Sequence, residues 1–146
     1  MLNISVRKAI FSDAQSICNI NKNSLGYDYP LKNTKEQIKK ILTDDKTILL
    51  VSVVEDNIVT GYIEASIYDT AYSGTYVNIM ALAVDGKHQK NGCGKMLLTA
   101  VEDWAKNNNA VGIRLESSTF RTEAHKFYEA CGYECLKEHK NFKRIF

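Results

Sequence analysis

The sequence predicts an α+β fold built around a mixed, mostly antiparallel central sheet. Residues 47–54, 58–68 and 75–84 are apolar, β-branched runs separated by short turns, a pattern typical of consecutive antiparallel strands. The third run leads through a glycine-containing loop into an amphipathic helix at 96–105 and an alternating strand at 111–116. A strand–helix–strand unit with short joints is right-handed, so these last two strands should be parallel. This order excludes a doubly wound, all-parallel sheet.

The N-terminal part of the chain predicts one strand and two helices. Residues 4–9 alternate roughly between apolar and polar side chains, which is typical of a strand. Ser12 or Asp13 can cap a first helix, which should end near residue 23. Thr34 is followed three residues later by a glutamine, and this capping-box pattern predicts the start of a second helix.

The C-terminal part predicts one more helix and two closing strands. Apolar residues at helical spacing run from Ala124 to Cys131, and Gly132 can supply the left-handed residue that ends such a helix. Residues 133–139 and 141–146 then look like a pair of strands.

The composition limits the classes of function. The 146 residues suit one domain, 1–146, and its 45% apolar and 25% charged residues are ordinary for a globular protein. A net charge of +2 is too small to indicate binding of nucleic acid or a membrane. The N-terminus does not resemble a signal peptide, and no apolar stretch reaches the length of a membrane span. The four cysteines lack disulfide or zinc spacing, so we expect reduced thiols, a cytoplasmic location and no bound metal.

The chain is organised around the basic loop between the strand 75–84 and the following helix. Glycines let the backbone approach a phosphate, and the first helical turn offers unpaired N–H groups, so the loop predicts an anion site. Two familiar nucleotide motifs do not fit it. Leu97 stands where the dinucleotide fingerprint requires a third glycine. Lys95 is followed by Met96, where a P-loop requires Ser or Thr.

The segment Gln89–Gly94 resembles the Q/R-x-x-G-x-G/A pyrophosphate loop of the GNAT family of N-acetyltransferases, which use acetyl-coenzyme A. Arg121–Tyr133, with its Ala-x-x-Phe-Tyr sequence and closing glycine, is similar to the family's C-terminal block. Arg7–Ala9 with Asp13 is similar to its opening, and the predicted element order also matches. The resemblance implies a three-layer α/β/α fold whose parallel strands splay apart. It also implies an N-acetyltransferase that moves an acetyl group from acetyl-coenzyme A directly to a primary amine.

By resemblance, two stretches of the chain bind most of the cofactor. The backbone of residues 82–84 pairs with pantetheine like an added strand, and an N–H there faces the developing oxyanion. The loop supplies N–H groups to the pyrophosphate, and the C-terminal block adds contacts. The residues implied in cofactor binding are Leu82, Ala83, Val84, Gln89, Lys90, Asn91, Gly92, Cys93, Gly94, Lys95, Arg121 and Phe127.

Three side chains are candidates for proton transfer. The resemblance implies that the phenol of Tyr128 protonates the departing thiolate. Glu116, at the end of the strand 111–116, is the leading base. Glu64, on a neighbouring hairpin strand, is its rival, and either carboxylate could act through a water molecule.

By resemblance, the acceptor amine binds between the loop after the first helix and the turn after the strand 58–68. The candidate contacts are Tyr27, Asp28, Tyr29, Tyr68, Asp69 and Tyr72. Aromatic rings and carboxylates suit a cationic amine, which could belong to a small molecule or to a protein. The alternative function is a non-catalytic acyl-coenzyme A-binding sensor or interaction module. A homodimer that pairs the C-terminal strands is a further expectation.

Overall fold

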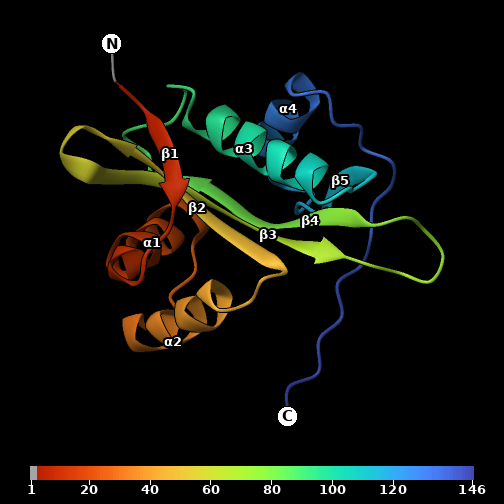
Figure 1. The fold of residues 1–146 in the computed structure, drawn as a ribbon, viewed down its shortest axis with the longest axis horizontal. Coiled ribbons are helices and arrows are strands. Elements are labelled where there is room, and N and C mark those ends of the chain that lie inside the picture. Colours follow the sequence, from red (N-terminus) through yellow and green to blue (C-terminus); the bar gives the residue numbers. More distant parts are fainter. Residues whose placement is uncertain (1–2) are drawn as a thin grey trace. The chain divides into compact units, whose positions relative to one another are not determined.

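A computed structural model describes residues 3–146, which divide into two compact units (Figure 1). The first unit ends at Leu115, and the second comprises Glu116–Phe146. The first unit contains, in chain order, β1 (Ser5–Lys8), a 3-10 turn (Phe11–Asp13), α1 (Ala14–Ile20), a π-helical turn (Asn21–Leu25), α2 (Leu31–Leu42), β2 (Thr47–Val54), a 3-10 turn (Glu55–Asn57), β3 (Ile58–Tyr68), β4 (Tyr76–Val84), α3 (Cys93–Asn107) and β5 (Gly112–Leu115). The second unit contains α4 (Thr122–Ala130).

The first unit is built on a five-stranded sheet with the strand order β1-β2-β3-β4-β5. The β1–β2, β2–β3 and β3–β4 pairs are antiparallel, whereas β4 and β5 are parallel. The predicted mixed sheet and its parallel strand–helix–strand unit are thus confirmed. β2 and β3 form where the sequence is rich in β-branched and apolar residues, whose side chains pack well on a pleated surface.

The two parallel strands part near their middle. β4 pairs with β5 only over Tyr76–Ile79 and Gly112–Leu115. The β3–β4 register then skips Met80, which is an extra, bulged residue in β4. Beyond this bulge β5 does not pair with residues 80–84. The predicted splay is confirmed, and it leaves one edge of β4 without a neighbouring strand from the first unit.

Helices cover both faces of the sheet (Figure 1). α1 and α2 pack on one face, against β3 and β2, while α3 packs on the other, against β2, β3 and β4. Alternate residues of β2 point to the α1–α2 side, where Leu49, Val51 and Val53 join the main hydrophobic cluster. The buried residues of α3 are Cys93, Leu97, Leu98, Val101 and Ala105. The predicted three-layer arrangement is therefore confirmed.

A partly buried ion pair joins β1 to the start of α1. The Asp13 carboxylate accepts hydrogen bonds from the Arg7 guanidinium at 2.8 and 2.9 Å and from the Ile10 N–H at 2.8 Å. Burial alone would raise the pKa of Asp13, but these bonds favour the ionised carboxylate, and the net shift is downward. Asp13 is the N-cap residue of α1, although its side chain makes no capping bond to that helix.

α2 begins three residues before the predicted cap, so the assignment of Thr34 as its N-cap was wrong. The N-cap is Pro30, and its extended ψ of 143° keeps the helix from starting any earlier than Leu31. Thr34 lies in the first turn and is buried, and its hydroxyl donates to the Pro30 carbonyl oxygen at 3.1 Å. Inside a helix, a buried threonine hydroxyl can donate a hydrogen bond to the carbonyl four residues earlier. The sequence pattern alone does not distinguish such a threonine from an N-cap.

The second unit confirms the predicted helix but not the predicted strands. α4 ends in a Schellman motif, because the Tyr133 N–H donates to the Tyr128 carbonyl and the Gly132 N–H to the Glu129 carbonyl, both at 3.0 Å. Gly132 has the left-handed φ of +91° that this motif requires. The segments 133–139 and 141–146 contain no strand, so that prediction was wrong. Alternating residues form a strand only where another strand satisfies their backbone groups.

Candidate active site

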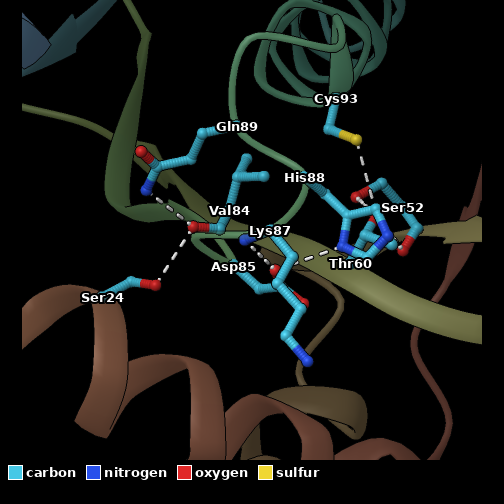
Figure 2. Close-up of polar contacts among 9 residues, drawn as sticks. All are labelled: Ser24, Ser52, Thr60, Val84, Asp85, Lys87, His88, Gln89 and Cys93. Atoms are coloured by element: carbon cyan, nitrogen blue, oxygen red, sulfur yellow. Dashed lines mark hydrogen bonds and ion pairs between the residues drawn. The ribbon is translucent and has the colours of Figure 1, made fainter.

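The loop after β4 is held by one acidic side chain and the strand beside it (Figure 2). Asp85 Oδ1 accepts a hydrogen bond from the Lys87 N–H at 2.7 Å and lies 3.1 Å from His88 Nδ1. The Asp85 N–H donates to the Thr60 carbonyl on β3 at 2.7 Å. The loop is therefore shaped by its own hydrogen bonds and anchored to the sheet.

The carbonyl oxygen of Val84 connects this loop to the segment after α1. It accepts one hydrogen bond from Ser24 Oγ at 3.1 Å and another from Gln89 Nε2 at 3.2 Å, as Figure 2 shows. Ser24 lies in the π-helical turn and Gln89 in the loop, so one backbone atom links the two segments. Sequence reasoning missed Ser24, and no sequence signal marks it.

The loop ends in an uncapped helix N-terminus. Gly92 is the N-cap of α3 with a φ of +90°, and no side chain caps the helix there. The helix begins at Cys93 rather than near Met96, so Cys93, Gly94 and Lys95 form its first turn. The N–H groups of that turn have no partner within the helix, and together with the helix dipole they favour an anion.

A buried chain of polar side chains supports this N-terminus. Cys93 Sγ lies 3.5 Å from Thr60 Oγ1, and Thr60 Oγ1 lies 2.9 Å from Ser52 Oγ (Figure 2). All three residues are fully buried. Burial keeps the Cys93 thiol away from any substrate, so its role is to pack and orient the helix start. Ser52 and Thr60 were missed, although Ser52 interrupts an apolar run.

An open cleft lies where the acceptor amine was expected. α1 continues through the π-helical turn to Gly26, whose φ of +75° turns the chain into the following loop. Residues of this turn and loop line an outer cavity of about 430 Å³. They are Asn21, Gly26, Tyr27, Asp28 and Tyr29.

A smaller cavity of about 100 Å³, called the inner cavity here, lies between α1, α2 and the sheet. The two cavities share Asn21 and Tyr29. The inner cavity is lined by Ile17, Asn21, Tyr29, Thr34, Gln37, Ile38, Ile41, Leu49, Tyr62 and Glu64. α1, α2, β2 and β3 therefore all contribute to it.

Glu64 is the carboxylate of this inner cavity. Its burial raises the pKa of its side chain, because the charged form loses hydration. The pKa of Tyr62 is also raised well above its usual range, mainly by burial and to a smaller extent by the nearby charge of Glu64. The Tyr62 hydroxyl donates a hydrogen bond to Asn21 Oδ1. Glu64 pairs with Ala81, which lies in the stretch of β4 whose other edge is open.

The other candidates for acceptor contacts, Tyr68, Asp69 and Tyr72, do not line either cavity. The Tyr68 ring lies under the guanidinium of Arg114, whose Cζ is 4.4 Å from the ring centroid. Asp69 Oδ1 accepts a hydrogen bond from Thr75 Oγ1 at 2.6 Å. Tyr72 is exposed at the tip of the β3–β4 turn.

The remaining candidates belong to the second unit. The Tyr128 ring packs edge-on against Phe127, with 5.4 Å between centroids, and against Tyr133 at 6.0 Å. Burial raises the pKa of the Tyr128 hydroxyl, and the positive charge of Arg121 opposes this shift. Glu116 is exposed, and its Oε1 lies 3.8 Å from His139 Nδ1. Arg121 is the N-cap residue of α4.

The comparison with known families decides what kind of protein this is. The Acetyltransferase (GNAT) family model matches residues 14–133. This chain belongs to the GNAT family of acetyltransferases. The match runs from α1 through α4 and so includes the loop, the splayed strands and the C-terminal block. The predicted family is confirmed.

Solved structures share the fold of this GNAT protein over nearly its full length. The aminoglycoside N-acetyltransferase AAC(6')-Iy, solved with the bisubstrate analog CoA-S-monomethyl-acetylneamine, is 20% identical, covers 99% of each chain and has a TM-score of 0.86. A transcriptional regulator from Bacillus halodurans C-125 is 19% identical, covering 99% of this chain and 100% of that chain, with a TM-score of 0.84. A possible acetyltransferase from Clostridium difficile 630 is 22% identical, covering 98% and 99%, with a TM-score of 0.79. No curated protein sequence matches the chain.

The first unit of this GNAT protein contains three parts of the predicted site. They are the loop at residues 85–92, the open edge of β4, and the cleft that contains Glu64. Within residues 3–146, no helix is long and apolar enough to cross a membrane. The same residues contain no group of three or more His, Cys, Asp or Glu side chains that could hold a metal ion.

Proposed function

We propose that this GNAT protein transfers an acetyl group from acetyl-coenzyme A directly to a primary amine. The observation that carries the proposal is the uncapped N-terminus of α3 beside the open edge of β4. The first offers N–H groups to a pyrophosphate, and the second offers backbone groups to the amides of pantetheine. A neighbouring structure with the same fold was solved with a coenzyme A bisubstrate analog, which supports this choice of cofactor.

The proposed cofactor site joins both stretches. Residues 89–95 hold the pyrophosphate through backbone N–H groups, and the exposed side chains of Lys90 and Lys95 add positive charge. Residues 82–84 pair with pantetheine, and one N–H of this edge stabilises the oxyanion. Arg121 and Phe127 of the second unit are proposed as further cofactor contacts.

The reaction requires two proton transfers. The amine nitrogen attacks the carbonyl carbon of the thioester, the carbonyl oxygen takes the negative charge, and the C–S bond breaks as this intermediate collapses. A base removes one proton from the amine nitrogen. An acid gives one proton to the coenzyme A thiolate, and we assign this role to Tyr128, whose raised pKa keeps its phenol protonated.

Glu64 is the better supported base. It lines the inner cavity, and its strand, β3, pairs with β4, whose other edge is open. Its raised pKa makes the carboxylate a stronger base than an exposed glutamate. Adjacent strands lie about 4.8 Å apart, so one water molecule can relay the proton from the amine. Glu116, by contrast, is exposed beside His139.

The decisive assay is thiol release from acetyl-coenzyme A over a panel of amines. The Tyr128→Phe variant should lose about 100-fold or more in kcat while its cofactor affinity stays close to that of the wild type. Tyr133→Phe is the matched control, because it removes a hydroxyl from the neighbouring ring. Equal kcat values for the two variants would remove Tyr128 from the mechanism.

The alternative is a non-catalytic acyl-coenzyme A-binding sensor or interaction module. One structurally similar protein is described as a transcriptional regulator, which is the observation that favours it. Tight cofactor binding without turnover on any amine would support this alternative.

Two further proposals concern the setting of the protein. All four cysteines are free thiols, which supports the proposed cytoplasmic location.

The proposed homodimer no longer has its expected surface, because residues 133–146 contain no strand that could pair. Gel filtration with light scattering tests the oligomeric state directly.

A further inference from the structure

We propose that Ser24 is a positioning residue that couples the acetyl-coenzyme A site to the outer cavity, where the acceptor amine was expected. It acts through its hydrogen bond of 3.1 Å to the carbonyl oxygen of Val84. This inference rests on the proposed acetyl transfer and goes beyond it, because Ser24 acts through the backbone of β4 rather than on the reacting atoms. Its consequence is that a bound cofactor stabilises the turn that lines the outer cavity.

The carbonyl oxygen of Val84 lies on the edge of β4 that is proposed to bind pantetheine. The N–H of the next residue, Asp85, points the other way and donates to the Thr60 carbonyl of β3 at 2.7 Å. Successive residues of a strand direct their backbone groups to alternate edges, so those of Leu82 and Val84 face away from β3. β5 does not pair with this part of β4. The bond from Ser24 therefore ends on the open edge itself.

The two donors to Val84 mark where pairing with pantetheine ends. A carbonyl oxygen has two lone pairs, and this one accepts bonds from Ser24 Oγ and, at 3.2 Å, from Gln89 Nε2 (Figure 2). The N–H of Val84 and both backbone groups of Leu82 face the same edge and can pair with the amides of pantetheine. The cofactor can thus pair with the strand end while the bond from Ser24 stays in place.

Ser24 lies within the turn that lines the outer cavity. Asn21 and Gly26, which flank it in the sequence, both belong to that lining. The Tyr27 N–H donates to the Asn21 carbonyl at 3.0 Å and closes the turn around Ser24. Ser24 is half-buried, whereas the preceding residue, Asn23, is exposed. A displacement of Ser24 therefore displaces the lining of the cavity.

The coupling follows from local opening of this turn. Residues 26–29 are exposed, so the turn should open more readily than the core of the first unit. Pairing with pantetheine orders the end of β4, and an ordered Val84 carbonyl keeps Ser24 bound for more of the time. One hydrogen bond changes such an equilibrium by roughly fivefold. By linkage, the acceptor then binds more tightly to the complex with the cofactor than to the protein alone.

Amide hydrogen exchange of the full chain, with and without coenzyme A, tests this coupling. In the wild type, saturating coenzyme A should slow exchange both in residues 85–95 and in the turn at residues 21–29, in the turn by roughly fivefold. Ser24→Ala should keep the protection of residues 85–95 and lose that of the turn. Asn23→Ala is the matched control, because it shortens the exposed side chain next to Ser24, and it should behave like the wild type.

A conservative variant and a kinetic measurement separate positioning from a general loss of structure. Ser24→Thr retains a hydroxyl, so it should restore the protection of the turn. With whichever amine of the panel is acetylated, Ser24→Ala should raise the KM for that amine by roughly fivefold, because the turn lines the acceptor site. Its kcat should stay within about twofold of the wild-type value, because Ser24 does not act on the reacting atoms.

The outcomes separate this inference from the proposed function. If Ser24→Ala keeps the protection of the turn, or if coenzyme A protects only residues 85–95 in the wild type, the inference fails while the acetyltransferase stands. An unchanged KM in Ser24→Ala also overturns it. If coenzyme A protects neither stretch of the wild type, the proposed cofactor site fails, and the inference fails with it.

Discussion

Glu64 combines two properties that are seldom compatible in a stable protein, namely an ionisable side chain and a largely buried position. Burial raises its pKa because water no longer solvates the carboxylate fully. The group therefore lowers stability when it is charged. Active sites often contain such groups, since a base with a raised pKa is more effective near neutral pH.

The first prediction concerns the pH dependence of stability. A raised folded-state pKa contributes stability below the unfolded-state pKa, and this contribution is lost as the pH rises through the folded-state pKa. Glu64→Gln removes the titration, so the variant should be more stable than the wild type at pH 8 and lose this advantage at pH 4. Urea unfolding at several pH values measures the difference. The exposed Glu36→Gln is the control, and an equal response of both variants would contradict the assignment.

The same residue yields a prediction about catalysis. If Glu64 is the base, Glu64→Gln should lower kcat by about 100-fold or more, whereas Glu116→Gln should change it by less than about tenfold. The kcat of the wild type should rise with pH as Glu64 loses its proton. Steady-state kinetics from pH 5 to pH 9 check both statements. If Glu116→Gln lowered kcat more than Glu64→Gln did, Glu116 would be assigned as the base instead.

At the scale of elements, the path from β4 through the loop into α3 depends on local backbone shape. The loop is bound to β3 through Asp85 and Thr60, and to the π-helical turn through Val84 and Ser24. The same β3 threonine also contacts Cys93 at the start of α3. The loop after β4, the π-helical turn and the start of α3 are thus linked to neighbouring ends of β3 and β4 by hydrogen bonds.

Two glycines of this loop allow a matched test. Gly92 has a φ of +90°, whereas Gly86 is not in the left-handed region, and neither would bring an added Cβ within 4 Å of another group. Gly92→Ala should therefore cost about 1–2 kcal/mol of stability from backbone strain and weaken coenzyme A binding. Gly86→Ala should cause a smaller loss of stability and a smaller loss of coenzyme A affinity. Urea unfolding and calorimetric titration measure the two effects, and equal losses would show that φ is not the cause.

At the scale of the whole molecule, cofactor binding should stabilise the folded chain. A ligand at about 100 times its Kd adds about 2.7 kcal/mol, which corresponds to a rise of about 5–10 °C in Tm for a chain of this size. Coenzyme A should produce such a shift in differential scanning fluorimetry. Pantetheine, which lacks the pyrophosphate, should produce a much smaller one. Equal shifts would contradict the assignment of residues 89–95.

Much of this protein follows from the order of residues along the chain. The runs that form β2, β3 and β4, the amphipathic pattern of α3 and the glycine at the end of α4 each act within a few residues, so local periodicity and backbone preference suffice to predict them. The family followed from the loop segment Gln89–Gly94 and the C-terminal block, which are also local patterns.

Only the tertiary structure decided the features that depend on residues far apart in the sequence. The bulge at Met80, the hydrogen bond from Ser24 to Val84 and the burial of Glu64 beside α1 and α2 all come from packing between distant segments. The absence of strands in residues 133–146 has the same origin, because an alternating pattern does not reveal whether a partner strand is available. Local sequence thus determined which elements form, whereas packing determined which side chains meet, since contact and burial are properties of the whole fold.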